Sequence, residues 1–274
     1  MLGLTNHAHP SNIMSRRFFG TVLVLSLCEV LVLGADGPVA GRVIPRMPPP
    51  GIPIPPEIRS ELASGVASLG LEIQELSRQL KAKPALLELL PDVQIYHNAV
   101  RYAVEDNIFY KTNDFAAARK FLTEGTERAR ALREGRSPWT AATGLVVRGY
   151  RSRIDDSVQP YGLVVPASYR EGTGHQHRLD FWFHGRNGNL SEISFISDRE
   201  NNRGEFTPED TFVLHPYGRY CNANKFAGEV DAFEALENVR KHYPIDENRI
   251  SVRGFSMGGA ATWHLAAHHA GLWA

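Results

Sequence analysis

A serine in the C-terminal part of the chain has the neighbours that a catalytic nucleophile needs. Ser256 is the centre of a G-x-S-x-G motif, which follows an alternating, strand-like run at residues 249–253 and precedes an alanine-rich run at residues 260–267. A serine on a sharp strand-to-helix turn exposes its hydroxyl, and the flanking glycines let the strand and the helix pass closely. The motif therefore predicts Ser256 as the nucleophile and Gly254 and Gly258 as elbow glycines. The alternative is a glycine-rich turn in which Ser256 only caps a helix.

A serine nucleophile needs a base, and the sequence after Ser256 offers poor candidates. His264, His268 and His269 follow it, all on the helix predicted to begin at the motif. Because a helix rises about 1.5 Å per residue, His264 points along the helix, two turns away from the serine. We expect none of these histidines to be the base, and we interpret His264 and His268 as part of a solvated helix face.

Two further histidines have spacing that could suit a metal. His175 and His177 lie in a polar loop before a predicted strand, but no cysteine or carboxylate cluster accompanies them in the sequence. We therefore expect no metal site, and nothing in the chain indicates a cofactor.

Composition excludes one class of function. The 274 residues contain 30 Lys and Arg against 30 Asp and Glu, so there is no basic excess of the kind that nucleic acid binding needs. The two cysteines are Cys28 and Cys221, and we expect the first to be removed with a signal peptide. No disulfide framework is therefore predicted, and Cys221 is interpreted as an inert thiol.

The N-terminus has the pattern of an export signal. Arginines at 16–17 precede an apolar run at 18–33, and small residues follow at 34–35. We predict a signal peptide over residues 1–35, a secreted or periplasmic protein exported by the Sec or the twin-arginine route, and no stable membrane span after cleavage. An uncleaved anchor is the alternative, and Met14 is a second candidate start.

The rest of the chain divides into three predicted segments. Residues 36–56 are rich in proline and predict an extended linker. Residues 57–136 predict a small helical module, in which apolar residues recur at steps of three and four. Its helices are expected to run from about 58 to 82, from 91 to 106 and from 114 to 133.

Residues 137–274 change to a β-rich pattern. Runs at 144–150 and 159–166 predict an antiparallel hairpin, and strands are expected at 178–185, 211–216 and 249–253. Helices are expected at 229–243 and after Ser256. This alternation predicts an α/β fold with a mostly parallel sheet covered by helices.

These motifs resemble a known family. From about residue 139 onward, the chain resembles the N-terminal half of the α/β-hydrolase fold, and particularly secreted bacterial prolyl oligopeptidase (S9) family serine peptidases and polyhydroxybutyrate-depolymerase-like esterases. The resemblance is carried by four sequences: Gln159-Pro160-Tyr161, Phe183-His184-Gly185-Arg186, Asp246-Glu247-Asn248-Arg249-Ile250 and Gly254-Phe255-Ser256-Met257-Gly258-Gly259.

The resemblance implies a mechanism. Ser256 would attack an ester or amide carbonyl of a small-molecule ester or a peptide. The backbone N–H groups of Met257 and of Gly185 or Arg186 would form the oxyanion hole. His184 is expected to shape its loop.

In this family the acid and the histidine follow the serine on later strands, whereas this chain ends at Ala274. The resemblance therefore implies a truncated serine hydrolase, incomplete in its α/β-hydrolase domain and inactive alone. An esterase and a non-catalytic secreted interaction module remain the alternatives, and the absence of a propeller-like segment favours an esterase over a strict oligopeptidase.

Overall fold

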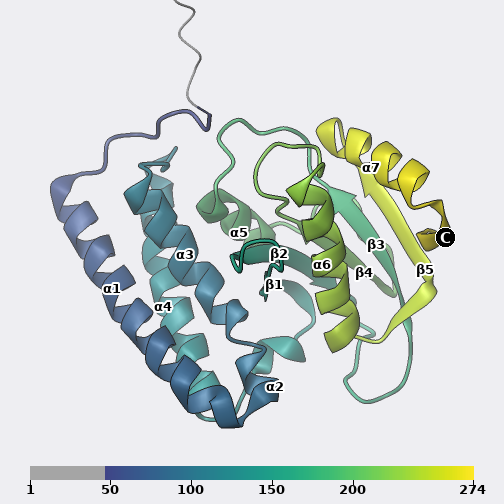
Figure 1. Ribbon diagram of the computed structural model, residues 1–274, viewed down its shortest axis with the longest axis horizontal. Coiled ribbons are helices and arrows are strands. Elements are labelled where there is room, and N and C mark those ends of the chain that lie inside the picture. The colour runs from purple at the N-terminus through teal and green to yellow at the C-terminus, as the bar shows by residue number, and fades with distance from the viewer. Residues whose placement is uncertain (1–46) are drawn as a thin grey trace, which may run out of the picture. The chain divides into compact units, whose positions relative to one another are not determined.

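The computed structural model describes residues 47–274 (Figure 1). The predicted signal peptide at 1–35 and the first part of the predicted linker at 36–56 lie outside the described residues. The described residues form one compact unit. Within residues 47–274, every helix is too short or too polar to cross a bilayer.

Helices form the first part of this unit. Helix α1 (Pro56–Gln79) continues into a short 3-10 turn and is followed by α2 (Pro84–Leu87), α3 (Pro91–Glu105) and α4 (Asn113–Arg133). Prolines stand in the first turn of α1, α2 and α3, where the missing N–H costs no helical hydrogen bond. The apolar positions of α1 that the periodicity selects are buried as one stripe: Leu62, Leu69, Ile73 and Leu76.

The described end of the predicted linker packs on these helices. The backbone N–H groups of Gly51 and Ile52 donate to the carbonyls of Asn107 and Phe109 at 2.9 and 2.7 Å. Ile54 is buried. Residues 51–54 are therefore fixed to the helical part. The proline content alone predicts a free extended spacer here.

Five strands form one sheet in the order β1-β2-β4-β3-β5. The first two pair antiparallel as predicted, β2 also pairs antiparallel with β4, and β3 runs parallel to both β4 and β5. The strand bounds are β1 (Gly144–Arg151), β2 (Val158–Val165), β3 (His177–Phe183), β4 (Thr211–Pro216) and β5 (Ile245–Gly254).

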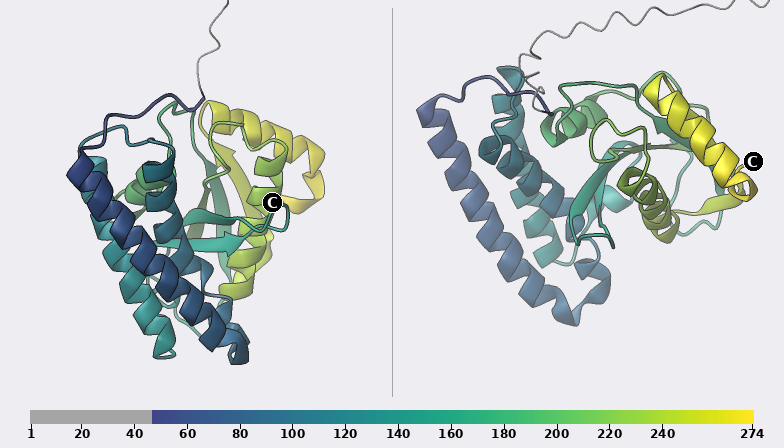
Figure 2. Two further views of the ribbon diagram at one scale, coloured as in Figure 1. Left: turned by 60° about the vertical axis from the view of Figure 1, so that its left-hand side comes forward. Right: turned by 45° about the horizontal axis from the view of Figure 1, so that its top comes forward.

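Helices cover both faces of this sheet, as the two views in Figure 2 show. Helices α3 and α5 (Glu192–Asn201) contact one face of β1 and β2, while α6 (Ala227–His242) and α7 (Met257–His268) pack on the other face. Val146 and Val147 are neighbours on β1 but enter these two separate cores, because successive strand residues point to opposite faces. The predicted fold class, an α/β sheet preceded by a small helical module, is confirmed. The prediction of a mostly parallel sheet is wrong for residues 47–274, because only two of the four strand pairings are parallel.

Candidate active site

Ser256 lies on a sharp turn between a strand and a helix. Strand β5 ends at Gly254 and α7 begins at Met257. The Ser256 backbone has φ 52° and ψ −111°, and its side chain is exposed. A positive φ at a residue other than glycine costs on the order of 1–3 kcal/mol and persists where the surrounding structure imposes it. The turn therefore holds the hydroxyl away from the sheet, as a nucleophile elbow requires.

The two glycines of the motif are needed for close packing. A Cβ on Gly254 would lie 2.4 Å from the backbone carbonyl of Gly258. A Cβ on Gly258 would lie 2.0 Å from the carbonyl oxygen of Phe183, at the end of β3. Both distances are far below van der Waals contact, so any larger side chain would push α7 away from the sheet.

The loop after β3 touches this turn. The backbone N–H of Phe255 donates to the Phe183 carbonyl at 3.2 Å, and a Cβ on Gly185 would lie 3.0 Å from the Phe255 ring. All six residues expected at the site thus gather where β3, β5 and α7 meet: Gly185, Arg186, Gly254, Ser256, Met257 and Gly258.

The backbone donors at this junction are free to bind a ligand. Residues 47–274 supply no hydrogen-bond acceptor for the N–H groups of Gly185, Arg186 or Met257. Met257 opens α7, where helix N–H groups and the helix dipole favour negative charge. Donors from two segments, the loop after β3 and the first turn of α7, thus lie near the junction where Ser256 stands.

His184 links two loops at this end of the sheet. Its Nδ1 lies 2.9 Å from the Gly185 carbonyl oxygen, and its Nε2 lies 3.2 Å from the Tyr217 carbonyl oxygen. Both ring nitrogens therefore face backbone acceptors instead of the Ser256 hydroxyl. These contacts fit a residue that shapes its loop.

The histidines that follow Ser256 have another partner. His264 and His269 place their Nε2 atoms 2.7 Å from the two carboxylate oxygens of Glu229 on α6. These hydrogen bonds lower the pKa of Glu229, the one with His264 contributing most. His268 is exposed, whereas His264 is only partly exposed because its imidazole is held against Glu229. In the described part of the chain, Ser256 has no histidine as a hydrogen-bond partner.

A pocket of about 430 Å³ opens beside the elbow. Phe255 and Gly185 line it on the elbow side, and Arg199 and His215 line it farther in. Burial lowers the pKa of His215 well below its usual value, and the nearby Arg199 acts in the same direction. His215 is therefore neutral, with Nδ1 3.0 Å from an Arg199 Nη atom.

Sequence reasoning did not single out His215 or Arg199. His215 stands near the carboxyl end of a predicted strand, where sites form in α/β sheets, and this position was the available signal. Arg199 lies on α5, a helix that is not among those predicted from the sequence.

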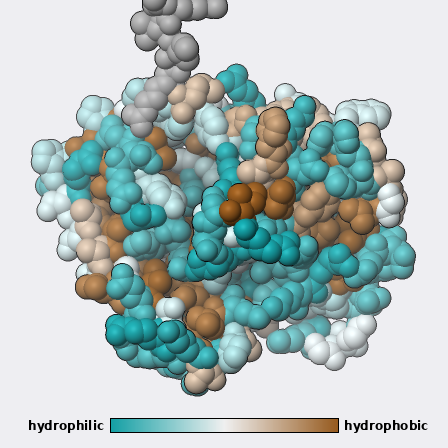
Figure 3. Space-filling model, in the orientation of Figure 1, coloured by the Kyte–Doolittle hydropathy of each residue, from teal (hydrophilic) through white to brown (hydrophobic). Residues whose placement is uncertain are grey.

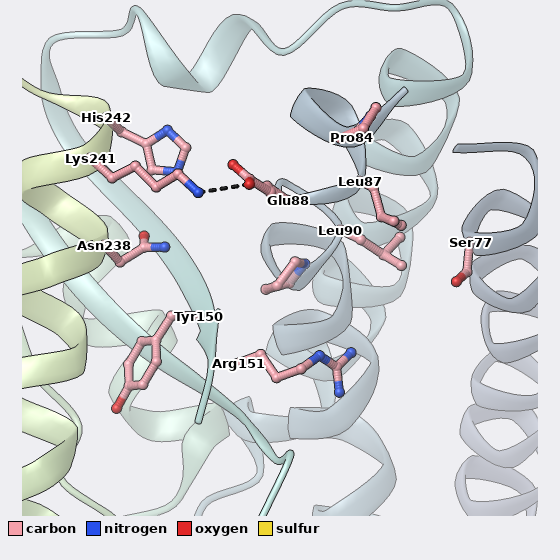
Figure 4. A pocket seen from close by; sticks show the side chains of 11 residues that line it. Ser77, Pro84, Leu87, Glu88, Leu90, Tyr150, Arg151, Asn238, Lys241 and His242 are labelled. Atoms are coloured by element: carbon pink, nitrogen blue, oxygen red, sulfur yellow. Dashed lines mark ion pairs between the residues drawn. The ribbon is translucent and has the colours of Figure 1, made fainter. Parts of the chain in front are cut away.

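A larger pocket of about 540 Å³ lies elsewhere, between α2 and α6 (Figure 4). Lys241 reaches across it to Glu88, with Nζ 2.7 Å from a carboxylate oxygen. Its lining includes none of the elbow residues. The smaller pocket is therefore the candidate substrate pocket.

No protein-family model and no curated protein matches this chain. Among solved structures, a thermostable esterase is 20% identical over 47% of this chain and 39% of its own, with a TM-score of 0.34. The fluorophosphonate-binding serine hydrolase F of Staphylococcus aureus is 16% identical over 48% of this chain and 55% of its own, with a TM-score of 0.38.

A third similar structure is a peptidase. The acylaminoacyl peptidase of Pyrococcus horikoshii is 14% identical over 46% of this chain and 21% of its own, with a TM-score of 0.29. The chain thus spans 39%, 55% and 21% of the lengths of these three structures.

Proposed function

We propose that this chain carries the nucleophile half of a serine hydrolase that cleaves an ester or a peptide bond. Ser256 is the nucleophile, and the backbone N–H groups of Met257 and of Gly185 or Arg186 stabilise the oxyanion. The observation that carries the proposal is the Ser256 backbone, whose φ of 52° marks a strained strand-to-helix turn. The next residue, Met257, has an N–H group for which residues 47–274 supply no acceptor. Such donors act strongly on a developing charge, each contributing on the order of 3 kcal/mol.

The proposed chemistry requires a base that residues 47–274 do not place at Ser256. His184, His264 and His269 are committed to other acceptors. Without a base, the serine hydroxyl is a weak nucleophile. We therefore propose that the chain alone turns over substrate poorly and that its acid and histidine come from sequence beyond these residues.

Among the substrates of serine hydrolases, we propose an ester for this chain. The pocket beside Phe255 is lined by both polar and apolar side chains, which suits a small ester with an apolar group. The prolyl oligopeptidase-like peptidase remains the alternative. Secretion after removal of residues 1–35 also remains a proposal.

Two reactions test the nucleophile and the missing base separately. A fluorophosphonate probe should label Ser256 slowly, as read by peptide mass spectrometry, and Ser256→Ala should abolish the adduct. The rate at which the chain hydrolyses a p-nitrophenyl ester should rise when imidazole is added as a free base. The rate of Ser256→Ala at the same imidazole concentration is the background to be subtracted.

The results of these reactions test the nucleophile, the missing base and the substrate separately. An equal adduct yield in Ser256→Ala would exclude Ser256 as the nucleophile. Turnover that depends on Ser256 but needs no imidazole would contradict the proposal that the base is missing. It would still support Ser256 as the nucleophile. Cleavage of a peptide p-nitroanilide in preference to the ester would favour the peptidase.

A non-catalytic interaction module is the second candidate, and surface composition favours it. Trp263 on α7 and Phe226 before α6 are 80% and 89% exposed. On the face drawn in Figure 3, hydrophobic side chains form a small patch near the centre and further patches toward the right and the lower left. Absence of any Ser256 adduct in a folded chain would support this candidate.

A further inference from the structure

A second cluster of reactive side chains lies at the opposite end of the sheet from Ser256. His177 is the first residue of β3, and Asp210 immediately precedes β4, which runs parallel to it. Ser256 follows the carboxyl end of β5, which is also parallel to β3 (Figure 1). The cluster at the amino ends of these strands is therefore separate from the proposed active site and goes beyond the proposed function.

Strand pairing supplies the carboxylate that the sequence around the two histidines lacks. Asp210 Oδ1 lies 2.8 Å from His177 Nδ1, and Asp210 Oδ2 lies 3.2 Å from His175 Nε2. One ligand atom from each of the three residues falls within 4.8 Å of the others. Two imidazoles and a carboxylate thus converge on one point, although Asp210 is 35 residues from His175.

This spacing suits a small divalent cation. Zinc binds nitrogen and oxygen ligands at about 2.0–2.2 Å in a tetrahedron, which places the ligand atoms about 3.3 Å from one another. Asp210 Oδ1 lies 2.8 Å from His177 Nδ1 and 3.3 Å from His175 Nε2, which is close to this spacing. Since all three ligand atoms lie within 4.8 Å of one another, a side-chain adjustment of about an ångström would bring them around one ion. Imidazole donors favour zinc and similar transition metals, whereas magnesium and calcium prefer oxygen.

The environment of His177 is a second observation, independent of the ligand spacing, that points to a bound ion. Its side chain is 1% exposed, and neither ring nitrogen has a hydrogen-bond partner within residues 47–274. The 2.8 Å approach to Asp210 lacks hydrogen-bond geometry, and the rings of Tyr169 and Phe212 flank the imidazole. A buried imidazole without hydrogen bonds is rare in folded proteins, and coordination of a cation would satisfy it.

The surroundings orient the other ligands and leave an approach from solvent. Ser168 Oγ donates to Asp210 Oδ1 at 2.6 Å, in the way that outer-shell groups hold metal-binding carboxylates. The side chains of His175 and Asp210 are 56% and 40% exposed. The fourth coordination position would therefore face water.

We propose that His175, His177 and Asp210 form a binding site for a divalent transition metal, with zinc as the preferred ion. The site holds one ion per chain through three protein ligands and a water molecule. Ser168 acts as a positioning residue through the Asp210 carboxylate.

Zinc binding by the full chain tests the site. After treatment with EDTA and removal of the chelator, calorimetry should detect one zinc per chain, and saturating zinc should raise the thermal midpoint because it binds the folded state. Cobalt should give the visible absorption of a tetrahedral complex. His175→Ala and Asp210→Asn should abolish saturable binding, and Ser168→Ala should weaken it about tenfold.

The variants are chosen to keep the fold. His175 is exposed, and asparagine tolerates the positive backbone φ of 51° at position 210. His268→Ala removes an exposed histidine elsewhere and should bind zinc like the wild type. Ser256→Ala should also bind zinc fully, so this result does not depend on the proposed hydrolase activity.

Specific results would overturn the proposal. One is zinc binding by the wild type that is no tighter than binding by the His175→Ala, Asp210→Asn double variant. Another is binding of calcium in preference to zinc. A third is loss of zinc binding in His268→Ala with retention in His175→Ala, which would place the ion on another surface.

Discussion

Gly258 packs so closely on Phe183 that a Cβ at this glycine would lie 2.0 Å from the Phe183 carbonyl oxygen. This contact joins the first turn of α7 to the end of β3, and it fixes the turn on which Ser256 stands. The geometry of the nucleophile therefore depends on backbone packing two residues away, and it needs no side-chain contact to Ser256 itself.

Gly258→Ala should destabilise the protein and displace the elbow. The methyl group would meet backbone atoms that cannot rotate away, and overpacking of this kind costs about 1–3 kcal/mol. The free energy of unfolding, measured with urea and circular dichroism, should fall by that amount. Labelling of Ser256 by a fluorophosphonate should fall as well.

Gly259→Ala is the matched control. A Cβ on Gly259 would lie 3.6 Å from the Gly254 carbonyl oxygen, which is ordinary contact. Alanine is a better helix former than glycine by up to about 1 kcal/mol, so this variant should keep or gain stability. Equal losses in the two variants would contradict the packing explanation.

Asp92→Ala should destabilise the protein strongly, because it leaves the buried charge of Arg148 without its partner. Asp92 and Arg148 are 0% and 1% exposed, and their side chains pair at 3.0 Å. Burial opposes the Arg148 charge, but attraction to Asp92 outweighs it and raises the arginine pKa. Removing one member of such a pair costs about 3–5 kcal/mol, which urea unfolding should detect.

The exposed pair between Arg119 and Glu61 provides the comparison. Its geometry is also bidentate, with two contacts of 2.6 Å, but solvent screens it. Glu61→Gln should leave the unfolding midpoint nearly unchanged. A loss as large as that of Asp92→Ala would show that burial is not the deciding factor.

Sequence reasoning predicted those features that depend on neighbouring residues. The elbow at Ser256 is a local motif, and the proline at 91 and the apolar repeat of α1 mark helices directly. The antiparallel pairing of β1 with β2 likewise follows from two β-rich runs joined by a short polar turn.

Features that depend on distant residues were missed. Asp210 reaches His177 because β3 and β4 are parallel neighbours, so local inspection found no carboxylate near the histidines. Helix α5 has ten residues, too few for its apolar positions to show a clear period. Ile193 and Ile196 are buried in the shared core on one face of the sheet, and tertiary packing holds the helix there.

Glu192→Gln should stabilise the protein increasingly as pH rises. Burial raises the pKa of Glu192 from 4.5 to about 8, although Arg101 acts in the opposite direction. The folded protein thus holds this proton more tightly than the unfolded chain does. Stability attributable to Glu192 is greatest below pH 4.5 and is lost as pH rises toward 8, by at most about 1.4 kcal/mol per pH unit.

Urea unfolding at several pH values measures this difference. The gap between Glu192→Gln and the wild type should widen from pH 4.5 to pH 8 and then level off. Glu57→Gln is the matched control, because Glu57 also lies in a helix first turn but is exposed. Because Glu57 is exposed, its replacement should change the free energy of unfolding little. A Glu192→Gln gap that does not change with pH would mean that this carboxyl group is already ionised in the fold.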